Sequence, residues 1–71
     1  MGLVTTKEVL EDGYRNHYAI GAFAAHNLEI VKAVVSAAEA MQTPVIIQTT
    51  PGTVRYIGIN HVYAMVKTAA E

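Results

Sequence analysis

The stretch PVIIQTTPGT, residues 44–53, decides the fold class. It begins as an apolar strand without polar alternation, which is typical of a strand covered on both faces. It ends in hydroxyl groups and a Pro-Gly pair that can begin a helix, with Thr50 as the N-cap and Pro51 in the first position. A chain of 71 residues has little mass with which to cover both faces of such a strand.

A similar strand and helix come before this stretch. The segment YAIGAFAA, residues 18–25, is apolar without alternation and predicts the first strand. Asn27 suits the N-cap of the next helix, and Glu29 in the first turn complements the helix dipole. That helix has an apolar stripe at helical spacing, made of Val31, Val34, Val35 and Ala38.

Helices are also predicted at both ends of the chain. Thr5 and Glu8 have the spacing of a capping box, and the helix they begin is expected to end within residues 13–16. Towards the other end, Gly58 is expected to end a short helix and Asn60 to cap the last one. The last helix has an apolar stripe of Val62, Met65, Val66 and Ala69.

The predicted element order is α-β-α-β-α-α. A strand, a helix and a second strand joined by short loops indicate two parallel strands with a right-handed crossover. Such a pair needs cover on both faces and neighbouring strands at its edges. We therefore expect residues 1–71 to be a single incomplete domain, the opening segment of a larger α/β architecture.

The composition excludes several classes of partner. Hydrophobic residues make up 52% of the chain and charged residues 15%, with a net charge of −1, so nothing attracts nucleic acid or an anionic membrane. The apolar run at residues 19–25 is too short to span a bilayer, and the N-terminus does not resemble a signal peptide. The absence of cysteine fits a cytoplasmic location.

Polar residues follow both predicted strands. His26 and Asn27 follow the first, and Thr49 and Thr50 follow the second. Active sites of α/β barrels and ligand crevices of open parallel sheets lie at this edge. Thr49, Thr50 and the N–H groups after Pro51, beginning with Gly52, can receive a phosphate at a helix N-terminus. The simpler alternative is that Thr50 only caps the helix, and one residue can do both.

Other chemistries find little support. The three histidines lack metal-ligand spacing, and His26 with Glu29 is expected to serve the start of its helix. Ser36 is the only serine, so a nucleophilic triad is not credible. Neither a P-loop nor a dinucleotide fingerprint is present. Arg55 and Lys67 are expected to be solvated, and most of the four tyrosines to be half-buried packing residues.

Residues 18–53, YAIGAFAAHNLEIVKAVVSAAEAMQTPVIIQTTPGT, resemble the first two βα units of class II, zinc-dependent fructose-bisphosphate and tagatose-bisphosphate aldolases. The family pattern is YAV-x-AFN-x-x-N-x-E, an alanine-rich helix, and then APVI-x-x-x-[ST]-x-G. The similarity covers nearly the whole chain, including the leading VTTKEVL at residues 4–10. It implies an α/β fold that is a partial TIM (β/α)8 barrel: an N-terminal helix plus the first two βα units.

The resemblance implies a carbon–carbon lyase of carbohydrate metabolism. Such enzymes reversibly cleave fructose- or tagatose-1,6-bisphosphate to dihydroxyacetone phosphate and glyceraldehyde 3-phosphate, with zinc as a Lewis acid. The zinc ligands and the acid–base aspartate of the family come from later strands. No catalytic residue and no zinc ligand is therefore expected in this chain, which alone should be inactive. The HNLE and TPGT details favour the tagatose branch.

Few site residues carry over from the family. Thr50 matches the Ser/Thr that helps to hold a substrate phosphate. Asn27 matches a family asparagine but also fits a helix cap. Ala24 stands where the family has a substrate-contacting asparagine, and losing one such hydrogen bond typically costs about 1–3 kcal/mol.

Two other functions remain open. The chain can be a non-catalytic oligomerisation or subunit-interaction module, which pairs its strand edges with copies of itself or with a full-length aldolase. It can also be a phosphate-binding half of another barrel or of an open α/β fold. The interaction module would form a homo-oligomer. A truncated gene product or an excised fragment of an aldolase would instead need the rest of the barrel.

Overall fold

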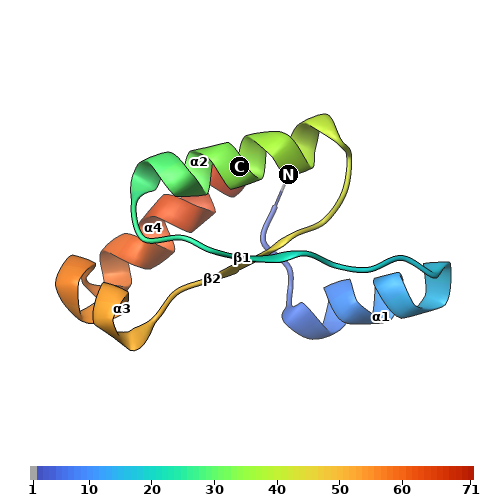
Figure 1. The fold of residues 1–71 in the computed structure, drawn as a ribbon, viewed down its shortest axis with the longest axis horizontal. Helices are drawn as coiled ribbons and strands as arrows, with labels where there is room; N and C mark the ends of the chain where they lie inside the picture. Colours follow the sequence, from blue (N-terminus) through green and yellow to red (C-terminus); the bar gives the residue numbers. More distant parts are fainter. Residues whose placement is uncertain (1) are drawn as a thin grey trace.

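A computed structural model describes residues 2–71 and confirms the predicted order of elements. The molecule is elongated, with extents of 37 × 22 × 16 Å, and its two strands cross near the centre (Figure 1). In chain order the elements are α1 (Thr6–Asn16), β1 (Ala22–Ala24), α2 (Leu28–Ala40), β2 (Ile46–Gln48), α3 (Pro51–Ile57) and α4 (Ile59–Ala70).

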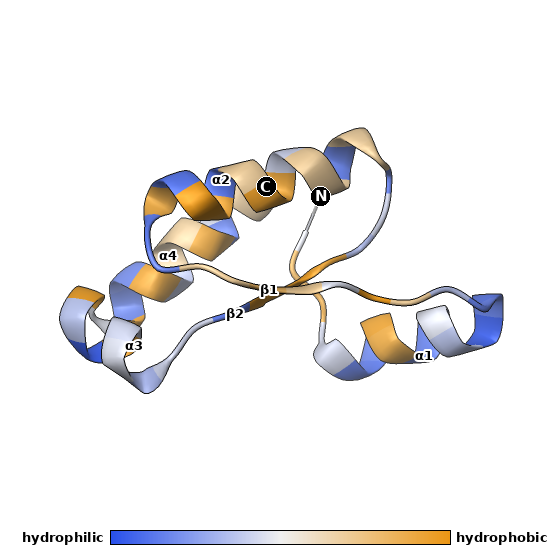
Figure 2. Ribbon diagram, in the orientation of Figure 1, coloured by the Kyte–Doolittle hydropathy of each residue, from blue (hydrophilic) through white to orange (hydrophobic). Residues whose placement is uncertain are grey.

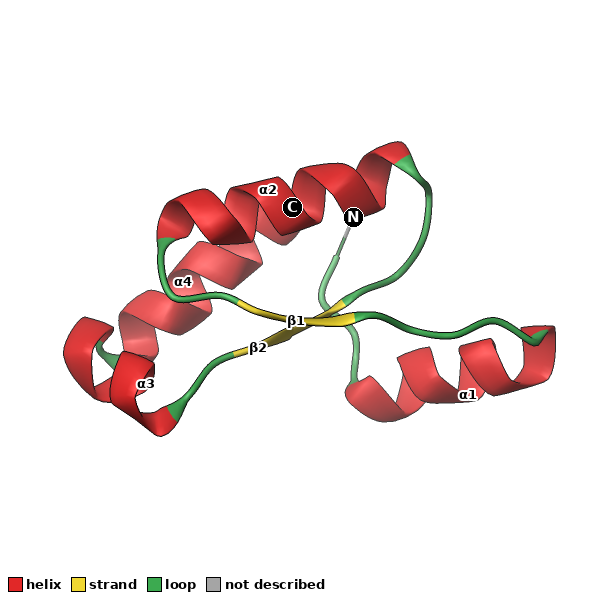
Figure 3. Ribbon diagram, in the orientation of Figure 1, coloured by secondary structure: helices red, strands yellow, loops and turns green. Residues whose placement is uncertain are grey.

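The two strands form a parallel sheet, as the sequence predicts. Ala22 pairs with Ile46 and Ala24 with Gln48, and each strand has only three residues. The strands occupy only the crossing, with loops on either side (Figure 3). The prediction of strands over residues 18–25 and 44–48 was therefore too long. Each strand has only one neighbouring strand, so the backbone hydrogen bonds between strands are confined to the point where the two cross. The residues before β1 run beside α1.

One face of the sheet carries the hydrophobic core. Helices α2 and α4 pack side by side there (Figure 1). Val31 and Ala25 are only 2% exposed, and Val35 completes the buried cluster. Partly buried residues pack against it from β2, α2 and α4: Ile30, Ile47, Val66 and Ala69. Both predicted helical stripes are confirmed, since every member is buried or half-buried.

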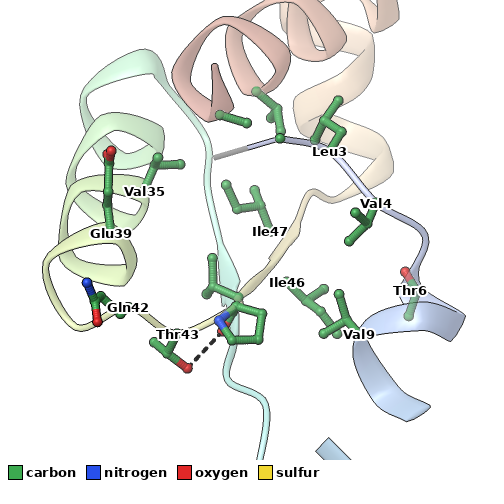
Figure 4. A pocket seen from close by; sticks show the side chains of 15 residues that line it. Leu3, Val4, Thr6, Val9, Val35, Glu39, Gln42, Thr43, Ile46 and Ile47 are labelled. Carbon is green, nitrogen blue, oxygen red and sulfur yellow. Dashed lines mark hydrogen bonds between the residues drawn. The ribbon is translucent and has the colours of Figure 1, made fainter. Parts of the chain in front are cut away.

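The opposite face of the sheet is largely bare. Alternation along the strands places Ala22, Ala24, Ile46 and Gln48 on it. Only α1 approaches, where Val9 lies beside Ile46 (Figure 4). The strands are accordingly not buried on both sides: β1 is exposed and residues 45–47 are half-buried. Hydrophobic residues thus lie at the surface along the crossing strands (Figure 2).

The exposed area of the chain agrees with this incomplete burial. The accessible surface is 5190 Å² for a mass of 7.6 kDa. A compact monomer of this mass exposes about 4300 Å². The excess corresponds to sheet and helix surface that no element of the chain covers.

Helix α1 begins and ends as predicted. The Thr5 hydroxyl accepts a hydrogen bond from the N–H of Glu8 at 3.1 Å, although no return bond from the Glu8 carboxylate forms among the described residues. The helix ends at Asn16, and His17 follows in the left-handed conformation. Gly13 does not end the helix; it is buried where the returning chain packs, and a Cβ there would lie 2.9 Å from the Tyr18 carbonyl oxygen.

The junction between α3 and α4 corrects one prediction. Gly58 ends α3 as expected, but its φ of 103° turns the chain directly into α4, which begins at Ile59. The Gly58 carbonyl accepts from the Val62 N–H at 3.0 Å. Asn60 is therefore already inside the helix, and the prediction that it is the N-cap was wrong.

The tyrosines also differ from expectation. Tyr14, Tyr56 and Tyr63 are 86%, 92% and 58% exposed, so the prediction that most are half-buried was wrong. Tyr18 alone is half-buried. The other three stand on helix faces with no neighbouring element to pack against. The Lys67 ammonium lies 6.0 Å from the Tyr63 ring centre, and Arg55 and Lys67 are exposed as expected.

Candidate functional site at the carboxyl ends of the strands

The parallel register brings the loops after β1 and β2 to one edge of the sheet. The Ala25 N–H donates to the Gln48 carbonyl at 2.9 Å, so the backbone segments are still paired at the carboxyl ends of β1 and β2. His26 comes from the first loop, and Thr50 and Thr53 from the start of α3. These three side chains meet at that edge.

A chain of hydrogen-bonding contacts joins the three residues. Thr50 and Thr53 have their hydroxyl oxygens 3.0 Å apart, and Thr50 Oγ1 also accepts from the Thr53 N–H at 3.1 Å. His26 Nδ1 lies 2.6 Å from Thr53 Oγ1. His26 therefore does not serve the start of its own helix, as the sequence had indicated; its ring contacts the next βα unit.

Helix α3 offers fewer free donors than its sequence suggests. Pro51 has no N–H, and the N–H groups of Thr53 and Val54 donate to the Thr50 hydroxyl and carbonyl oxygens. In the described part of the chain, only the Gly52 N–H of this first turn meets no protein acceptor. With seven residues, α3 is also a short helix. A ligand here would therefore depend on the hydroxyls and on this single amide.

Gly52 leaves open space beside the Thr50 hydroxyl. A Cβ at this position would lie 3.8 Å from Thr50 Oγ1, an ordinary contact distance. Both residues are exposed, and Gly52 has an unstrained helical backbone. The missing side chain thus keeps one side of the hydroxyl accessible.

The remaining predicted site residues are less engaged. Asn27 caps α2 as predicted, with its Oδ1 accepting from the Ile30 N–H at 2.8 Å. The half-buried Thr49 makes no side-chain hydrogen bond to the described residues. Ala24 pairs with Gln48 and places a methyl group at this edge.

The residues present do not fit a metal ion by themselves. Within residues 2–71, no group of three His, Asp or Glu side chains gathers closely enough to bind one. His26 is the only titratable side chain in the cluster. The arrangement is suited to hydrogen-bonding an anion through hydroxyl and amide groups rather than to covalent chemistry.

A mainly apolar cavity lies at the other end of the strands. It has a volume of about 600 Å³ and surrounds the amino-terminal end of β2, between residues 2–4, α1, α2 and α4 (Figure 4). Its lining is mainly apolar and includes Leu3, Val4, Val9, Ile46 and Ile47. Ligand sites of parallel α/β folds lie at the carboxyl ends of the strands, and this cavity lies at the opposite end.

The chain belongs to the class-II fructose-bisphosphate aldolase family. The family described as fructose-bisphosphate aldolase class-II matches residues 4–71, almost the entire sequence. The family is one of lyases that generally depend on zinc. Membership favours an aldolase barrel over the half of an unrelated barrel or an open sheet. None of the helices in residues 2–71 is long and apolar enough to cross a membrane.

Sequence reasoning had placed Thr50 at the site but had passed over Thr53 and given His26 another role. A spacing of three residues at a helix start brings Thr50 and Thr53 together, so that pairing was detectable. The contact from His26 depends on the tertiary crossing of the two units and has no local signal.

Proposed function

We propose that residues 1–71 are the N-terminal helix and the first two βα units of a class-II aldolase TIM barrel, and thus an incomplete domain. The observation that carries this proposal is the bare inner face of the sheet. Helices α2 and α4 cover one face, as the outer helices of a barrel do, while on the other face Ala22 and Ala24 are exposed and Ile46 meets only Val9 of α1. The family match supports the same reading.

In the complete barrel the reaction is the reversible cleavage of a ketose bisphosphate into dihydroxyacetone phosphate and glyceraldehyde 3-phosphate. Zinc supplies Lewis-acid polarisation of the substrate carbonyl when it is bound by residues of later strands. In this proposal, residues 2–71 supply neither a ligand to that metal nor the group that moves the reacting proton. The chain alone is accordingly inactive, and the HNLE and TPGT segments favour tagatose-1,6-bisphosphate over the fructose epimer.

The role of this chain is to hold a substrate phosphate. Thr50 donates its exposed hydroxyl and Gly52 its unpaired N–H. We include in the proposed site Thr49, which precedes Thr50, and Asn27, which follows His26. Hydroxyl and amide donors at the carboxyl ends of barrel strands are typical phosphate ligands. The family pattern has a substrate-contacting asparagine where this chain has Ala24. The lost side-chain amide weakens substrate binding in any barrel built from this chain.

Titration of the ¹⁵N-labelled chain with inorganic phosphate, followed by NMR, tests the proposed site. We expect saturable shifts at the Gly52 and Thr53 amides, lost in Thr50→Val and kept in Thr50→Ser. Shifts that are unchanged in Thr50→Val would place phosphate elsewhere. A parallel aldol-cleavage assay with added zinc should show no turnover, and turnover would contradict the proposed inactivity.

The exposed apolar surface also supports a second candidate, an oligomerisation or subunit-interaction module. Phe23 at the open edge of β1 is 50% exposed, and Leu3 beside the β2 cavity is 49% exposed. Size-exclusion chromatography with light scattering separates the two. A discrete homo-oligomer supports the module, whereas an ill-defined, dye-binding species supports a segment that needs the remaining barrel.

A further inference from the structure

The contacts among His26, Thr53 and Thr50 limit the number of hydroxyl hydrogens that remain for a ligand. Two contacts, His26 to Thr53 and Thr53 to Thr50, each need one hydrogen between the heavy atoms. Each hydroxyl supplies one. The imidazole supplies a third only when its Nδ1 carries a proton.

The count therefore depends on His26. With a bare Nδ1, Thr53 donates to the ring and Thr50 donates to Thr53, so no hydroxyl hydrogen is left. With a protonated Nδ1, the ring donates to Thr53, and three hydrogens serve two contacts. The surplus hydrogen belongs to one of the threonine hydroxyls and can be donated to an anion. The amide of Thr53 is already committed to Thr50 Oγ1 in both arrangements.

We propose that His26 is a positioning residue: in its Nδ1–H form it releases a threonine hydroxyl to the substrate phosphate. This inference rests on the proposed phosphate-binding role of Thr50 and adds a residue from the neighbouring βα unit. His26 does not contact the phosphate; it acts through Thr53. Phosphate, which accepts hydrogen bonds, consequently selects the Nδ1–H form of the ring.

The ¹⁵N signals of the histidine rings test this directly. The full chain, labelled at histidine, is compared with and without inorganic phosphate at about pH 8, where an ordinary histidine is neutral. His61 is an internal reference, because its Nδ1 lies 3.1 Å from the Ile57 carbonyl oxygen, which can only accept. We expect the His26 Nδ1 signal to move towards that of His61 on saturation. A bare Nδ1 in the phosphate complex would overturn the proposal.

A double-mutant cycle provides an independent test of function. His26→Asn keeps a donor near the Nδ1 position, whereas His26→Asp offers only acceptors, which capture the Thr53 hydroxyl. We expect His26→Asn to bind phosphate within about threefold of the native chain, because the lost contact is restored. His26→Asp should bind about tenfold or more weakly.

The carboxylate also repels phosphate. Both substitutions are therefore repeated together with Thr53→Val, which removes the hydroxyl that connects His26 to Thr50. The difference between Asp and Asn in that background measures repulsion alone. If His26 acts through Thr53, the ratio of the phosphate dissociation constants of the Asp and Asn variants should be about ten times larger when Thr53 is present. If this ratio is the same with and without Thr53 while binding still depends on Thr50, the role of His26 is overturned but the proposed phosphate site is not. If the native chain and Thr50→Val respond identically to phosphate, the proposed function fails, and this inference fails with it.

Discussion

The imidazole Nδ1 of His26 lies 2.6 Å from the hydroxyl oxygen of Thr53, 27 residues further along the chain. The contact joins the loop after β1 to the start of α3. It forms only when the two strands are paired in their parallel register, because that register brings the two loops to one edge. The candidate site is thus a product of the crossover, although each of its residues belongs to a short local motif.

Thr50 has two roles that substitution can separate. Thr50→Val removes both the cap and the hydroxyl, so α3 should lose about 1 kcal/mol of stability and phosphate binding should fall about tenfold. Thr50→Asp retains an oxygen that accepts from the Thr53 N–H, but it has no hydrogen to donate and repels the anion. It should preserve α3, as judged by NMR amide shifts of residues 51–57, while abolishing phosphate binding. Binding that survives Thr50→Asp would show that the threonine is only a cap.

Gly52→Ala should affect stability and binding in opposite directions. The backbone conformation is helical, so alanine should stabilise α3 by about 0.4–1 kcal/mol. The added methyl group lies about a contact distance from Thr50 Oγ1, where it shields the hydroxyl from phosphate. Helix content by circular dichroism should rise slightly, and the phosphate dissociation constant should rise several-fold. Unchanged binding would show that Gly52 has no part in the site.

Local patterns predicted the elements of this chain well. Thr5, Asn27 and Thr50 all cap helices as expected, because an N-cap depends only on the residues of its own first turn. The apolar stripes of α2 and α4 were likewise evident from their spacing. The errors arose where tertiary geometry decides. Gly58 turns the chain at positive φ and takes the capping position expected for Asn60.

The strands and the site show the same limit. An apolar run indicates that the strand needs cover on both faces, but not whether the chain supplies it. Residues 45–47 stay half-buried because α2 and α4 cover only one face of β2. The partner of His26 could not be foreseen for a related reason. Its ring could meet Glu29 in its own helix or a residue of the next unit, and only the crossing of the two units decides this.

Gly13→Ala should destabilise the packing of α1, although alanine is the better helix former. The new Cβ would lie 2.9 Å from the Tyr18 carbonyl oxygen and 3.2 Å from the Ile20 side chain. Relieving such a clash typically costs about 1–3 kcal/mol, more than the helical gain of about 1 kcal/mol. The Tyr18 N–H, which donates to the Gly13 carbonyl at 3.0 Å, should exchange with solvent several-fold faster. Unchanged exchange would show that the chain beside α1 adapts freely.

The Tyr18 hydroxyl donates a hydrogen bond to the Asp12 carboxylate, and this contact should give the ring a distinct titration. The hydrogen bond, aided by partial burial and the negative charge of Asp12, raises the pKa of Tyr18 above its ordinary value of 10.0. Since the neutral phenol is the form that donates, the contact is intact below pH 10 and is lost as the pH rises through the raised pKa. NMR of the Tyr18 ring should show this late titration. Asp12→Ala should return the pKa to about 10, whereas Asn16→Ala, which removes a different donor to Asp12, should leave it raised. An equal midpoint in the native chain and in Asp12→Ala would show that the two side chains do not meet in solution.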